Sequence, residues 1–144
     1  MIDTTVNVWG AERHPQYAAV VKELALLVWA AVQRCPPRYV TVECRPVRVL
    51  LEGEYTSKTS AMYQDGQYIT ICLGIKDVKT TSNRFRYIVA HELAHAYAPS
   101  VKLVRHVTRS GHDSDPVEKY ADKIAALVVT DYSRQDFYKE TPEW

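Results

Sequence analysis

The feature that most constrains the fold is a His-Glu-x-x-His pattern, from His91 to His95, inside an apolar run at residues 86–97. In a helix these two histidines are one turn and about 40° apart, so their imidazoles can bind one metal ion. Glu92 projects about 100° away from His91, too far for easy coordination but near enough to reach a water on the metal. The pattern predicts a zinc site with Glu92 as general base. The alternative is a chance spacing on an ordinary buried helix.

The residues around this pattern favour a largely buried helix. No glycine or proline interrupts residues 83–98, Thr81 or Ser82 can cap the N-terminus, and Pro99 ends the helix. The apolar residues at helical spacing are Phe85, Ile88, Val89, Leu93 and Ala94. Because apolar residues occupy so many sides of this helix, we expect only its histidine face to open into a cleft.

Periodicity in the rest of the chain predicts a small α+β domain. We expect an N-terminal helix that backs a short mixed or antiparallel sheet, a hairpin, and a C-terminal helix that bears a ligand. The expected elements are a helix at 15–34, strands at 39–44 and 47–51, a hairpin that turns at Asp65-Gly66 with strands at 62–63 and 68–73, and a last helix at 117–132.

The bulk composition suits a single domain that spans residues 1–144, with 47% hydrophobic residues. Residues 1–14 form a lead-in with little pattern, and residues 133–144 form a tail whose aromatic side chains dock on the body. The net charge of +1, with both signs interspersed, gives no general argument for nucleic acid or a membrane surface. Lys22 and Glu23 in the middle of the first helix argue against a membrane span.

The three cysteines, Cys35, Cys44 and Cys72, are odd in number and widely spaced, without a Cys-x-x-Cys pair. Neither a disulfide framework nor a thiolate zinc site is expected from them. We interpret them as small buried hydrophobes in a reducing compartment. Because the N-terminus also lacks the basic and apolar regions of a signal peptide, we expect a cytoplasmic protein.

A third zinc ligand is needed, since hydrolytic zinc sites typically have three protein ligands and an open fourth position. Glu118 and Asp122 lie four residues apart on the last helix, on a face that also carries the small residues Ala121 and Ala125. Glu118 can then bind zinc while Asp122 accepts the ring N–H of a liganding histidine. Considered alone, the two acids would more simply be solvated residues near a helix N-terminus. The missing ligand favours the metal site.

Taken together, these residues resemble the gluzincin metallopeptidases of the ImmA/IrrE type. In that family a Glu-x-x-Ala-Asn or Glu-x-x-Ala-Asp stretch follows the His-Glu-x-x-His helix, and residues 118–125 match it. Residues 84–90 and 65–71 also resemble the family, so the likeness covers roughly residues 38–130. The chain differs from the family at Ala94, where a glycine usually stands, and in having no recognisable helix-turn-helix segment.

The resemblance implies a zincin-like fold with one zinc ion per chain. The implied ligands are His91, His95 and Glu118. Glu92 would be the base, and Asp122 would orient a ligand. The resemblance also implies that an edge strand, here taken as residues 68–73, holds the substrate peptide in an extended form.

A second resemblance involves the basic stretch that follows Pro99. Gly111 and His112, which lies seventeen residues after His95, are similar to the third-ligand region of SprT-like proteases. There a histidine replaces the glutamate, and the substrates are DNA-bound proteins. Arg105 and Arg109 would then contact phosphates.

We prefer Glu118 over His112 as the third ligand, because the pairing of Glu118 with Asp122 explains two residues instead of one. If His112 is not a ligand, it is a candidate donor to the oxyanion of the transition state, as is His106. The stretch that carries both histidines is either a solvated loop or a loop that contacts substrate beside the metal.

The sequence therefore predicts a zinc-dependent metalloendopeptidase in which zinc-bound water, activated by Glu92, hydrolyses a peptide bond of a partner protein or peptide. A transcriptional regulator is one candidate substrate. Nucleic acid is expected only under the SprT-like alternative, and no membrane partner is expected. The rival from another class is a non-catalytic, zinc-containing protein-binding module. Such a module would close its site with both Glu118 and His112.

Overall fold

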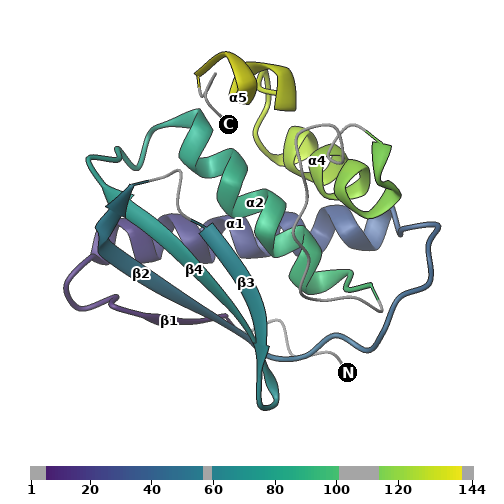
Figure 1. Cartoon of the computed structure of the whole chain (residues 1–144), viewed down its shortest axis with the longest axis horizontal. Helices are drawn as coiled ribbons and strands as arrows, with labels where there is room; N and C mark the ends of the chain where they lie inside the picture. Colours follow the sequence, from purple (N-terminus) through teal and green to yellow (C-terminus); the bar gives the residue numbers. More distant parts are fainter. Residues whose placement is uncertain (1–5, 57–59, 101–113, 141–144) are drawn as a thin grey trace.

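The computed structural model describes residues 6–56, 60–100 and 114–140. They form a small α+β fold with a mixed four-stranded sheet and, within these ranges, four helices, which confirms the predicted fold class (Figure 1). The strands are β1 (Val6–Trp9), β2 (Val47–Thr56), β3 (Ser60–Asp65) and β4 (Tyr68–Lys76). The helices are α1 (Pro15–Arg34), α2 (Asn83–Tyr97), α4 (Pro116–Val128) and α5 (Arg134–Glu140).

The strands follow the order β1-β2-β4-β3. β1, β2 and β4 are parallel, and β3 runs antiparallel to β4. β3 and β4 form the predicted hairpin, and Gly66 in its loop has a φ of 59°, which glycine adopts without steric cost. The assignment of residues 68–73 to an edge strand is wrong, because β4 is hydrogen-bonded to a strand on each side. The edge strands of this sheet are β1 and β3.

One face of the sheet belongs to the hydrophobic core. Alternate residues of β2 and β4 point into it in matching register. The buried pairs are Val47 with Ile69, Val49 with Ile71, and Leu51 with Leu73. Figure 1 shows α1 and α2 running along the sheet and α4 lying farther from it, against α2. The helix that carries the two histidines is therefore held between the sheet side and α4.

Helix α1 has the predicted bounds, and a proline occupies its first turn. It is long and apolar enough, by length and composition alone, to cross a membrane, a property that core helices of soluble proteins share. In this fold it packs against α2 and α4. Its buried residues are Ala18, Val21, Leu24, Ala25, Val28, Ala31 and Val32. The Tyr17 hydroxyl donates a hydrogen bond to the Val78 carbonyl oxygen beyond β4, which ties the start of α1 to the end of the sheet.

The strand predicted at residues 39–44 is not formed. Among the described residues, its strand-like pairing is limited to an isolated bridge between Thr41 and Ser100. The Val42 N–H donates to the Pro99 carbonyl oxygen, so the backbone hydrogen bonds of this segment go to residues just after α2 instead of to the sheet. The alternation of its side chains does not reflect a buried face, since Val40 is 75% exposed.

Three other expectations need correction. The lead-in contains β1, which pairs with β2 from Val6 onward. The last predicted helix ends at Val128 instead of residue 132, and the chain turns through Asp131, whose φ is 62°, into α5. The cysteines are half-buried, not buried. The docking of the tail is confirmed for Phe137 and Tyr138, which are buried in the core, whereas Trp144 lies outside the described residues.

Candidate metal centre

Helix α2 places both histidines on one face. Ser82 caps this helix, as one of the two predicted caps, by accepting a hydrogen bond from the Phe85 N–H at 3.3 Å. The rings of His91 and His95 follow one another along the helix, with centroids 4.6 Å apart and planes inclined at 82°. Both residues are buried, so α2 presents two imidazoles to a neighbouring element and not to open solvent.

Helix α4 supplies the third side chain. Asp115 caps it by accepting a hydrogen bond from the Val117 N–H at 2.8 Å, and Pro116 occupies its first position. Glu118 therefore lies in the first turn of α4, where the helix dipole also favours a negative charge. Ala121 and Ala125 are fully buried, and these small residues permit the close approach of α4 to α2.

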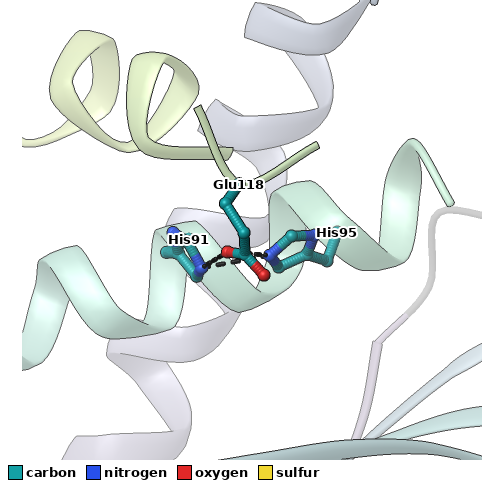
Figure 2. A group of neighbouring side chains, drawn as sticks. All are labelled: His91, His95 and Glu118. Atoms are coloured by element: carbon teal, nitrogen blue, oxygen red, sulfur yellow. Dashed lines mark hydrogen bonds and ion pairs between the residues drawn. The ribbon is translucent and has the colours of Figure 1, made fainter. Parts of the chain in front are cut away.

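The three side chains converge on one point (Figure 2). His91 Nε2 and His95 Nε2 are 3.0 Å apart, and Glu118 Oε2 lies 3.0 Å from each of them. Ligand atoms of a tetrahedral zinc site, each bonded at 2.0–2.1 Å, are separated by roughly 3.3 Å. The triangle is slightly smaller than that, and its donors are two imidazole nitrogens and one carboxylate oxygen. Both the chemistry and the spacing of the donors fit zinc.

Burial and mutual hydrogen bonding shift the pKa values inside this cluster. Burial disfavours the charged form of His91, but hydrogen bonds with Asp122 and Glu118 outweigh it and raise the pKa of His91 to about 9. Burial likewise opposes ionisation of Glu118, yet hydrogen bonds from His91 and His95 hold the pKa of its carboxyl far below the usual range. The metal-free cluster thus retains a proton that a metal ion would displace.

Asp122 orients His91. The Nδ1–H of His91 donates to Asp122 Oδ1 at 2.7 Å, which holds the ring so that Nε2 points at His95 and Glu118. Hydrogen bonding with His91 and Arg134 more than offsets burial and keeps the pKa of Asp122 well below its usual range, so the carboxylate stays ionised. The structure thus brings together His91, His95, Glu118 and Asp122 in the arrangement that the sequence predicts.

Glu92 follows His91 on α2 and is half-buried. Within the described part of the chain, no hydrogen bond or ion pair engages its carboxylate. Two tyrosines of the same helices have other partners: the Tyr97 ring packs against Trp29, and the Tyr120 hydroxyl donates to the Cys35 carbonyl oxygen at 2.6 Å.

Two of the candidate residues cannot be placed in this site. His106 and His112 lie outside the described residues, as do the arginines beside them. Conversely, the sequence did not identify one residue that the structure places at the site. This residue is Arg134, which contacts Asp122 from α5. No spacing pattern marks Arg134, because it reaches the site only through the turn between α4 and α5.

Comparison of the chain with protein-family models, with curated proteins and with solved structures found no match. The fold and the geometry of the candidate metal centre are therefore the basis for a functional assignment.

Proposed function

We propose that this protein is a zinc-dependent metallopeptidase of the gluzincin kind, with one zinc ion held by His91, His95 and Glu118. The observation that carries the proposal is the convergence of three buried ligand atoms, 3.0 Å from one another, from two helices. Two of these ligands flank a glutamate in the His-Glu-x-x-His pattern. A purely structural zinc site requires the ligands but has no need for that glutamate.

The chemistry divides among the residues as follows. Zinc, when bound, supplies Lewis acidity that makes a water molecule more acidic and polarises a peptide carbonyl. His91 and His95 bind as neutral imidazoles, and Glu118 contributes one negative charge. Glu92 accepts a proton from the attacking water and passes it to the leaving amine. Its freedom from other partners among the described residues suits this role, because its oxygens are available to a water.

The substrate that fits this proposal is a protein or peptide. The family resemblance implies an extended substrate on an edge strand. β3 is the edge strand that pairs with β4, and we propose it for this role. An extended peptide alongside β3 would gain main-chain hydrogen bonds. We propose the cytoplasm as the location and assign no role to nucleic acid or membrane.

The test is a comparison of Glu92→Gln with the wild type in zinc content and in cleavage of a fluorogenic peptide library. Glu92→Gln should keep one zinc per chain and lose at least about 100-fold in cleavage rate, since general base catalysis contributes about 10²–10⁴. The matched control Glu43→Gln removes the same charge at an exposed position and should leave cleavage unchanged. Full activity of Glu92→Gln would refute the mechanism. Zinc binding without cleavage by the wild type, together with retained binding of a partner, would support the non-catalytic module instead.

A further inference from the structure

Arg134, the first residue of α5, reaches from the C-terminal helix to the support of the metal centre. Its Nη2 donates to Asp122 Oδ1 at 2.7 Å, and its Nε lies 3.2 Å from both Asp122 oxygens. Only 11% of the Arg134 side chain and 15% of the Asp122 side chain are exposed. A charge pair this well buried and this well aligned is held in one geometry.

The geometry matters because Asp122 Oδ1 serves two donors at once. It accepts from His91 Nδ1 and from Arg134 Nη2, each at 2.7 Å. A carboxylate alone rotates readily about its last torsion. The Nε and Nη2 atoms of Arg134 fix that rotation and keep an Oδ1 lone pair directed at the Nδ1–H of His91.

Arg134 is itself fixed by aromatic side chains. Its guanidinium carbon lies 4.7 Å from the centroid of Phe137 and 5.3 Å from that of Tyr87, and both rings are buried. α5 begins with reciprocal bonds: the Ser133 N–H donates to Asp136 Oδ2 at 2.9 Å, and the Asp136 N–H donates to Ser133 Oγ at 3.4 Å. The start of α5 is therefore a defined platform for the guanidinium.

We propose that Arg134 is a positioning residue of the metal centre, which locks Asp122 onto His91 so that His91 Nε2 is presented to the metal. This inference rests on the proposed zinc site. It makes α5 a functional part of the site and not a passive tail. It also explains why a buried cation stands beside a cluster that must bind a cation: its charge is neutralised by Asp122.

The experiment measures zinc affinity by competition with a chromophoric chelator, together with the visible absorption spectrum of the Co²⁺-substituted protein. Arg134→Gln should weaken zinc binding by about tenfold, the lower end of the effect of residues that support a ligand, and should change the Co²⁺ spectrum. Arg134→Lys should lose less, because it keeps the charge but cannot span both Asp122 oxygens. Asp122→Asn should weaken zinc binding at least as much, and the double variant should show no further loss, since both changes break one network.

The matched control is Arg84→Gln. Arg84 also contacts the Phe137 ring, with its guanidinium carbon 4.9 Å from the centroid, but it lies in the first turn of α2, about two helical turns before His91. This variant removes a different cation from the same ring but leaves the contacts of Arg134 with Asp122 in place, so it should not change the Co²⁺ spectrum. If Arg134→Gln fails to fold, Arg134→Lys carries the test.

Three outcomes would overturn the inference. In two of them the proposed zinc site stands: wild-type zinc affinity and an unchanged Co²⁺ spectrum in the Arg134 variants, or additive losses in the double variant with Asp122→Asn. A wild-type chain that binds no zinc would overturn both the proposed function and the inference.

Discussion

The metal-free protein should become less stable as the pH rises from about 6.5 to about 9. Hydrogen bonds with Asp122 and Glu118, acting against burial, raise the pKa of His91 from its ordinary 6.5 to about 9 in the folded chain. A raised pKa means that the folded state holds the proton more tightly than the unfolded state. The contribution to stability is complete below about pH 6.5 and is lost as the pH passes 9. A shift of this size corresponds to on the order of 3 kcal/mol, at 1.36 kcal/mol for each pKa unit.

The assay is urea unfolding in the presence of a chelator, at intervals of half a pH unit from 6 to 9.5. The His91→Asn variant is the control and should lack this slope, because it has no proton to release. Zinc-loaded protein should also lack it, since zinc takes the place of the proton. A free energy of unfolding that stays constant or rises over this interval in the metal-free wild type would refute the reasoning. An equal slope in His91→Asn would refute it as well.

At acid pH the stability of the metal-free protein should change in the opposite direction and fall as the pH falls. The carboxyl of Glu118 has a depressed pKa, so its contribution is present above its ordinary value of 4.5 and is lost as the pH falls below it. The metal-free protein should therefore be most stable between about pH 4.5 and 6.5 with respect to this cluster.

The remaining predictions concern how the two helices are held. Ala121→Leu should cost about 1–3 kcal/mol in unfolding free energy and should weaken zinc binding. Ala121 is fully buried, so a larger side chain there pushes α4, and Glu118 with it, away from α2. The control Lys123→Leu, at an exposed position of the same helix, should leave zinc affinity unchanged. Ser82→Ala should cost about 1 kcal/mol by removing the cap of α2, whereas Thr81→Ala should cost little. An uncapped variant as stable as the wild type would contradict the assigned role of Ser82.

The helices and the candidate metal ligands could be predicted from the sequence because their signals are local. Pro15 and the prolines after Cys35 delimit α1, and Ser82 and Pro99 delimit α2. The i, i+4 spacing of the histidines fixes their common face whatever surrounds them. Glu118 required one further step, the missing third ligand.

The sequence-based predictions were wrong where the structure depends on contacts between segments that are distant in the sequence. Residues 39–44 alternate like a strand, but their backbone partners lie after α2, at Pro99 and Ser100. The strand order of the sheet is a tertiary property, so nothing within residues 68–73 could show that β4 is central. Arg134 lies twelve residues from Asp122 and meets it only because the chain reverses at Asp131.

The central claim is that Glu118 completes the metal site, and zinc content per chain tests it most directly. Zinc should be measured in the purified wild type, in Glu118→Ala and in His112→Ala, with circular dichroism to confirm that each variant is folded. One zinc per chain is expected in the wild type and in His112→Ala, with loss of zinc in Glu118→Ala. Loss of zinc in His112→Ala, with retention in Glu118→Ala, would contradict the claim and favour a SprT-like site.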